Sequence, residues 1–213
     1  MSFSNNDTIK KLEQLLPKSI NNQSVPKDVL IIIDKYIPKL NNRNIRQVVK
    51  DYLSKNKQIK NKIINTYGTI NDWDVSNITD MRCLFTEFED FNEDISGWNV
   101  SNVTNMDYLF CNAKIFNESI NNWNVSNVTY MRFMFSNALK FNQPLDNWNV
   151  SNVTDMRFLF GGAYSFNQPL NNWNVSNVTD MGYMFGSAHS FNQPLNNWNV
   201  SNVKYMNGTI GRK

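Results

Sequence analysis

The side chains of this chain that could act as acids, bases or nucleophiles are few and scattered. Its single histidine, His189, occupies a position that holds Glu89, Lys114, Leu139 or Tyr164 in the neighbouring 25-residue stretches. Such a tolerant position suits a surface and is a poor place for a general base. No Ser-His-Asp or Cys-His set can be assembled around one histidine there. We therefore expect no catalytic residue, no cofactor and no enzymatic activity.

Carboxylates cluster once in the sequence and could bind a divalent cation weakly. The cluster consists of Glu87, Glu89, Asp90, Glu93 and Asp94. Because no glycine-turned ligand loop accompanies it, a solvated acidic edge is the favoured interpretation. Cys83 and Cys111 form no spaced framework, and zinc would need more ligands than these two thiols. We therefore expect no metal site, and the unpatterned cysteines suit a reducing compartment or simple packing.

The dominant pattern is a tryptophan at every 25th residue, which must organise any surface that these side chains occupy. The six are Trp73, Trp98, Trp123, Trp148, Trp173 and Trp198. A fixed period of about 20 to 50 residues is typical of stacked repeats. Valine, methionine and phenylalanine recur at fixed distances after each tryptophan. We expect these positions to form one continuous core.

Within each unit, the spacing of apolar residues changes from that of a strand to that of a helix. Trp-x-Val alternates, as in a short strand with one buried face. From Met156 to Ala163 the spacing follows one face of a two-turn helix, with Thr154 placed as its N-cap. The sequence therefore predicts an α/β repeat, a right-handed leucine-rich-repeat-like solenoid of short parallel strands and short helices. About five and a half such units span residues 67–213.

The repeated unit also carries a family resemblance. It reads W-x-V-S-x-V-T-x-M-x-x-M-F-x-x-A-x-x-F-N-x-x-L, which resembles the BspA-like leucine-rich-repeat family of Mycoplasma surface lipoproteins, other bacteria, protists and giant DNA viruses. Residues 67–76 resemble the usual entry into such an array, and residues 44–53 resemble the amphipathic segment often found ahead of it. The resemblance implies a leucine-rich-repeat-like solenoid with a role in recognition, and no shared activity.

Residues 1–66 form a basic head that precedes the array. Residues 1–68 carry 13 Lys and Arg against 5 Asp and Glu, whereas residues 69–213 carry 8 against 13. Four segments have helical spacing: 9–16, 29–40, 45–53 and 59–64. Since the lysines are scattered along these helical periods, a solvated surface is favoured over a nucleic-acid or membrane contact. We expect an all-helical cap on the first repeat.

Residues 24–55 suggest a sharper alternative for the head, because they resemble the start of an F-box. The matching positions are Pro26, Asp28, Val29, Leu30 and Ile33, whereas Val25 replaces the usual leucine. Such a motif would imply docking to a Skp1-type adaptor of a ubiquitin ligase, with the repeats selecting the substrate.

The candidate binding surface has a uniform part and a variable part. Asparagines beside each tryptophan should line the concave face, as an amide ladder or as a site for a repeating ligand such as a glycan. On the following side they are Asn99, Asn124, Asn149, Asn174 and Asn199. Tyr130, Arg132 and Arg157 stand where residue types differ between units, and they could encode one specific protein partner.

The resulting functional prediction is a non-enzymatic scaffold for protein recognition, with the ubiquitin-ligase and glycan-binding roles as alternatives. The N-terminus lacks the apolar segment of a secretory signal. The longest apolar run, residues 29–33, is far too short to span a bilayer. We therefore expect an intracellular protein, without membrane insertion and without a nucleic-acid partner.

Overall fold

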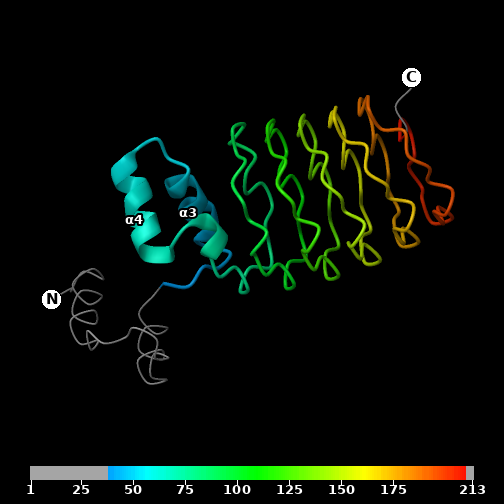
Figure 1. The fold of residues 1–213 in the computed structure, drawn as a ribbon. Coiled ribbons are helices and arrows are strands. Elements are labelled where there is room, and N and C mark those ends of the chain that lie inside the picture. The colour runs from blue at the N-terminus through cyan, green and yellow to red at the C-terminus, as the bar shows by residue number, and fades with distance from the viewer. Residues whose placement is uncertain (1–37, 210–213) are drawn as a thin grey trace, which may run out of the picture. The chain divides into compact units, whose positions relative to one another are not determined.

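The computed structural model describes residues 38–209, with helices only at the beginning of this range (Figure 1). Helix α3 is Ile45–Tyr52, helix α4 is Lys57–Tyr67, and a 3-10 helix, η1, is Ile70–Asp72. Two of the predicted helical segments are thereby confirmed. The segment 9–16, most of 29–40 and the first part of the F-box-like stretch lie outside the described residues. No helix of the described range is long and apolar enough to cross a bilayer.

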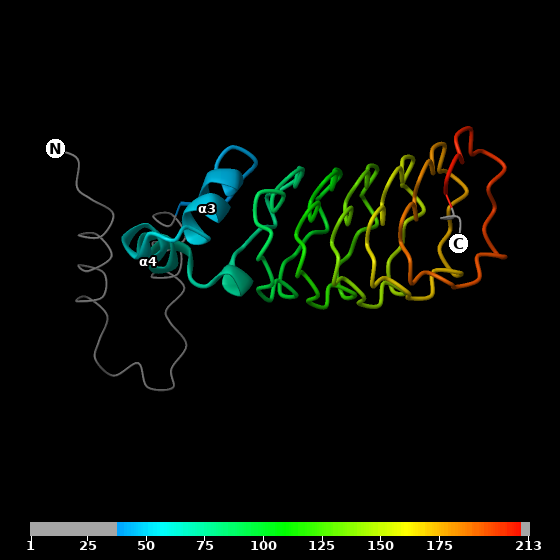
Figure 2. The same ribbon diagram turned by 90° about the horizontal axis from the view of Figure 1, so that it is seen from above.

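Five 25-residue units and a shorter sixth follow, and we number them one to six from their tryptophans, Trp73 to Trp198. The units lie side by side in sequence order, as Figure 1 and the view from above in Figure 2 show. Residues from Lys39 onward belong to one compact unit, so α3 and α4 pack with the array.

The predicted α/β solenoid of strands and helices is wrong. Between Trp73 and Thr209 the structure contains neither a β-strand nor an α-helix. Consecutive units are joined by isolated parallel bridges, which begin with Asp80 to Asn105 and end with Asp180 to Tyr205. The Trp-x-Val segments, expected to pair as parallel strands, form no bridge among the described residues.

The helix predicted for Met156–Ala163 is replaced by bonds between units. In the second unit, the N–H groups of Met106, Tyr108 and Phe110 donate to carbonyls of the third unit, at 3.0, 2.8 and 2.9 Å respectively. Every second N–H in this part of the unit is used in the same way. A two-turn helix is too short to be stable by itself, and stacking gives its N–H groups acceptors in the next unit. The predicted N-cap, Thr154, instead donates its N–H to the Thr129 carbonyl, at 2.9 Å.

The predicted core is confirmed. The tryptophans of units one to five are 3 % exposed, and the valines, methionines and phenylalanines at the repeated positions are buried with them through the fifth unit's Phe185. Equivalent phenylalanines stack on one another from unit to unit, for example Phe110 on Phe135 at 5.6 Å between ring centroids. Trp198, in the last unit, is only partly buried.

The distance between equivalent rings shows that the units are spaced unequally on their two sides. In units two to five, the residue ten positions after the tryptophan has an aromatic ring, and the centroids of these rings lie 4.7–4.9 Å apart from unit to unit. The distances rise to 5.4–5.6 Å and 5.7–6.0 Å for the two buried phenylalanine positions, and to 6.2–6.4 Å for the tryptophans. We call the side with the backbone bridges the narrow side and the tryptophan side the wide side.

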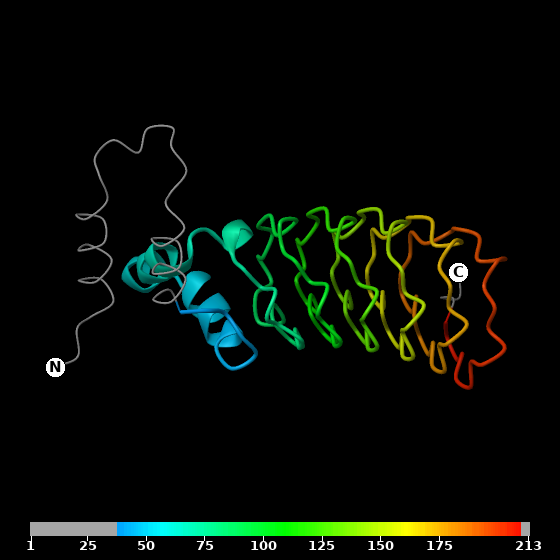
Figure 3. The same cartoon turned by 90° about the horizontal axis from the view of Figure 1, so that it is seen from below.

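The α3 helix covers the exposed edge of the first unit (Figure 3). Ile45, Val49 and Tyr52 are buried in the same cluster as the array core, and Tyr52 packs edge-on against Trp73 at 5.3 Å. Arg46 donates through Nε to the Arg82 carbonyl at 3.2 Å and forms an ion pair with Asp80. The predicted capping contact of the head with the first repeat is present for α3.

Candidate recognition surfaces

On the wide side, side chains rather than backbone groups join the units. The Trp123 indole N–H donates to the Ile95 carbonyl, 28 residues earlier, at 3.2 Å, and all later tryptophans repeat this bond. Asn127 donates through Nδ2 to the Ser101 carbonyl at 2.7 Å. At a spacing above 6 Å, backbone groups that pair directly at about 4.8 Å cannot meet. Indole and amide groups are long enough to span the difference.

The asparagines that follow the tryptophans lie exposed on this wide side. The carboxamide Oδ1 of Asn124 accepts a hydrogen bond from the Ser126 N–H at 3.2 Å, within the same unit. The equivalent bond recurs at Asn99, Asn149, Asn174 and Asn199. Within residues 38–209, these five side chains do not bond one another, so the predicted amide ladder is wrong for this row.

A shallow groove runs between the asparagines on either side of the tryptophan in units five and six. Its volume is about 380 Å³. It is lined by Asn171, Asn172, Trp173, Asn174, Val175, Asn197 and Asn199. The lining is therefore dominated by amides and includes one indole.

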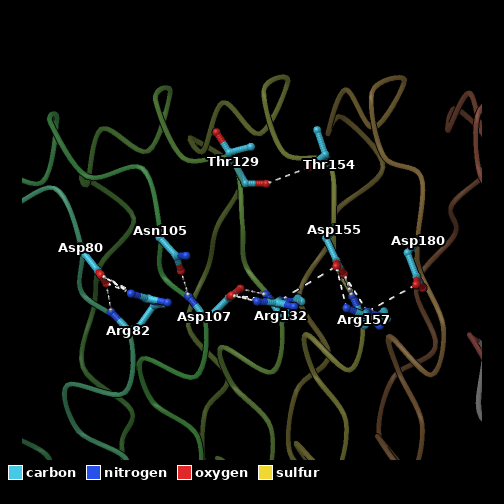
Figure 4. A network of polar contacts seen from close by, with 10 residues as sticks. All are labelled: Asp80, Arg82, Asn105, Asp107, Thr129, Arg132, Thr154, Asp155, Arg157 and Asp180. Atoms are coloured by element: carbon cyan, nitrogen blue, oxygen red, sulfur yellow. Dashed lines mark hydrogen bonds and ion pairs between the residues drawn. The ribbon is translucent and has the colours of Figure 1, made fainter.

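The narrow side carries a row of alternating charges that links four units (Figure 4). Arg132 bonds to Asp107 of the preceding unit, whose side chain is 1 % exposed, and it approaches Asp155 at 3.9 Å. Arg157 pairs with Asp155 at 2.9 Å and with Asp180 at 3.3 Å. The bond to Asp107 raises the pKa of Arg132 further above its usual range. These two predicted binding residues therefore already have partners within the array.

Beside this row runs a strip of aromatic rings, which the sequence analysis did not single out. Tyr108, Phe133, Phe158 and Tyr183 stack at 4.7–4.9 Å with their edges exposed. All four have left-handed backbone conformations, with φ between 51° and 58°. Tyr130, the third predicted residue of the variable surface, is 43 % exposed and lies close to Arg132. The structure thus brings Tyr130, Arg132 and Arg157 onto the same side of the array as the strip.

The groups that could have supported chemistry remain apart. The clustered carboxylates have separate partners, such as Lys50 for Glu87 and Lys114 for Glu89. In the described range no three His, Cys, Asp or Glu side chains gather where they could hold a metal ion. His189 stacks on Tyr164 at 4.8 Å. Burial, together with the nearby Cys83, raises the pKa of the Cys111 thiol.

Comparison with known proteins assigns the repeats to a family. The family model described as "Mycoplasma protein of unknown function, DUF285" matches residues 49–160 and 143–212. The chain belongs to this family. It is a Mycoplasma repeat family related to BspA-like surface proteins, and the match gives no support to the F-box resemblance. No curated protein and no solved structure matches the chain.

Proposed function

We propose that this DUF285 chain is a non-enzymatic recognition module that binds a protein partner through the narrow side of its array. The observation that supports this most strongly is the aromatic strip, Tyr108, Phe133, Phe158 and Tyr183. Tyrosine, phenylalanine and arginine are enriched in protein–protein interfaces. The strip, Tyr130 and the two arginines provide this composition on one surface.

The backbone of the strip adds a second argument. A left-handed conformation costs a residue with a side chain roughly 1–2 kcal/mol, and Phe133 and Phe158 have φ values of 54° and 51°. Stacking between neighbouring rings contributes about 0.5–1.5 kcal/mol per pair, so it does no more than offset this cost. Asparagine would avoid most of the cost, as it does at Asn112 and Asn137 with φ of 62° and 57°. Partly exposed aromatic residues at such positions therefore favour a binding role.

The proposal is tested by replacing the two central rings with residues that suit the same backbone. The double variant Phe133→Asn and Phe158→Asn should fold with nearly unchanged stability, because asparagine accommodates left-handed φ values. Cross-linking followed by mass spectrometry identifies the proteins captured by the wild-type chain. The double variant should lose the principal partner.

Tyr164→Asn provides the matched control, because Tyr164 is 47 % exposed and stacks on His189 away from the strip. This control should capture the same partner as the wild type. Equal capture by the double variant would show that the strip has only a structural role. Because two unpatterned thiols suit a reducing compartment, we propose that the capture experiment be made with an intracellular extract.

A further inference from the structure

A second surface, distinct from the aromatic strip, is formed by the asparagine row on the wide side. In each of these residues the bond from the serine two positions later fixes the carboxamide, for example Ser151 N–H to Asn149 Oδ1 at 3.1 Å. The Nδ2 groups of Asn124, Asn149 and Asn174 have no acceptor within residues 38–209. The row therefore presents oriented N–H donors that the fold itself does not use.

The units keep these donors at a regular spacing. Trp98 and Trp123 differ in orientation by 2° and lie 6.4 Å apart, and Trp148 and Trp173 differ by 4° at the same distance. Trp73 and Trp98 lie 6.2 Å apart and differ by 14°. Because each asparagine directly follows its tryptophan in the chain, we expect the donors to recur at about this interval.

This interval decides which polymer can bind in register. An extended peptide rises about 3.2–3.4 Å per residue, and carbonyls on one edge recur every second residue, about 6.4–6.8 Å apart. The narrow-side spacing of 4.7–4.9 Å would not match this repeat, whereas the 6.2–6.4 Å of the wide side does. Main-chain hydrogen bonds of this kind provide affinity in many peptide complexes.

We propose that the asparagine row binds an extended peptide segment of a partner protein, which runs along the array and accepts one amide N–H at every second residue. The groove between Asn172, Asn174, Asn197 and Asn199 gives such a segment a place to lie. Trp173 and Val175 also line it. Recognition is mainly of the peptide backbone, so the ligand is defined by its extended conformation more than by one side chain.

The first unit shows how the row can be changed without disturbing the fold. Asp74 stands where the other units have asparagine, and its Oδ1 accepts the Ser76 N–H at 3.0 Å. An aspartate thus keeps the bond that orients the side chain and has no N–H to donate. The triple variant Asn124→Asp, Asn149→Asp and Asn174→Asp is therefore expected to fold as the wild type does.

The probe is a peptide of about ten residues selected from a displayed random library against the full chain. Its affinity is measured by calorimetry for the wild type and for the triple variant. Each lost hydrogen bond weakens binding by roughly 2- to 10-fold, so the triple variant should bind at least about tenfold more weakly. Shortening the peptide should reduce affinity in steps of two residues, because each amide contacts every second carbonyl.

A control with the same change of charge uses the asparagines that lie 19 residues after the tryptophans. There Asn117 and Asn142 accept N–H groups of the following unit through Oδ1, and Asn167 does the same. The variant Asn117→Asp, Asn142→Asp and Asn167→Asp should bind the peptide as the wild type does. Equal weakening in both triple variants would overturn the proposal, because charge alone would then explain the loss.

Two other outcomes would also overturn it. If soluble linear oligosaccharides bind with the same dependence on Asn124, Asn149 and Asn174 and no selected peptide does, the row reads glycans. If a selected peptide is unaffected by the triple variant but lost with Phe133→Asn and Phe158→Asn, peptides bind the aromatic strip instead. The latter result would support the proposed function of the narrow side while removing this second site, so the two proposals fail separately.

Discussion

Neighbouring units are joined by different groups on the narrow side and on the wide side of the array. At 4.7–4.9 Å the backbones of neighbouring units bond directly, as Tyr108 N–H does to the Arg132 carbonyl at 2.8 Å. Where the tryptophan rings lie 6.2–6.4 Å apart, Trp123 and Asn127 close the gap by donating to the carbonyls of Ile95 and Ser101. The difference explains which residue types recur. Many side chains suit the narrow side because backbone atoms make the bonds, whereas the wide side requires an indole or an amide at a fixed position.

The largest effect should come from removing a wide-side tryptophan. Trp123→Ala should lower the free energy of unfolding by about 3–5 kcal/mol, the range for emptying an aromatic site in a core. Trp198→Ala should cost clearly less, because Trp198 is only partly buried. Trp123→Phe retains most of the apolar volume and isolates the lost bond to Ile95. Chemical denaturation measures all three, and equal losses at Trp123 and Trp198 would contradict stacking with a weaker last unit.

On the narrow side, the largest single loss should follow from removing the partner of the buried Asp107. Arg132→Ala leaves this carboxylate without its guanidinium and should cost roughly 1–3 kcal/mol. Arg157→Ala should cost less, about 0.5–1.5 kcal/mol, because its partners Asp155 and Asp180 are 16 % exposed whereas Asp107 is 1 % exposed. Thermal or urea unfolding of both variants tests this order. Small and equal losses would show that backbone bonds alone fix the narrow side.

A smaller effect is expected for the amides that span the wide side. Asn127→Ala removes the 2.7 Å bond to the Ser101 carbonyl and should cost about 0.5–1.5 kcal/mol. Asn124→Ala, three residues earlier, removes only an exposed bond at 3.2 Å and should cost less. Urea unfolding of these two variants tests whether the amides that bond across the wide side stabilise it. Identical stabilities would mean that the tryptophans suffice there.

The last effect concerns the α3 cap and is expected only at high pH. Burial and the 2.7 Å bond to Glu93 raise the pKa of Tyr52 to about 12 from the ordinary 10.0. The folded state thus favours the neutral phenol, so this contribution is complete below pH 10 and is lost as pH rises from there through 12. Tyr52→Phe should flatten the decline in stability between these values. Unchanged pH dependence in the variant would place the titrating group elsewhere, for example at Tyr67, whose pKa burial also raises.

Much of the core could be predicted from the sequence because identical residues at a fixed interval must occupy equivalent environments. The tryptophan, methionine and phenylalanine positions are buried as expected, and α3 and α4 follow from apolar spacing that no repeat neighbour disturbs. The conformation inside each unit could not be predicted in this way. Its apolar spacing fits a helix, but Phe158 has a φ of 51° and donates its N–H to the next unit at 3.0 Å.

The candidate surfaces were predictable only in part. Asn124 and its equivalents are exposed, as the pattern of the unit indicates, but their side of the array depends on where the backbones approach most closely. The aromatic strip was missed because Phe133 and Phe158 share their position with Cys83 and Tyr108, so the column looks irregular in the sequence. A search for ring-bearing residues at one position of successive units could have found it.

The sequence by itself determined that the chain repeats and which residues of the repeats are buried. Only the tertiary structure decided that the units are joined by isolated bridges, that they are closer on one side and that Asn124 faces the wider side. The reason is that a sequence period shows which residues of different units occupy equivalent positions, and it does not show how far apart the units lie. The hydrogen bonds that set their spacing join groups 22 to 28 residues apart, such as Trp123 and Ile95. These bonds exist only once the neighbouring unit is in place.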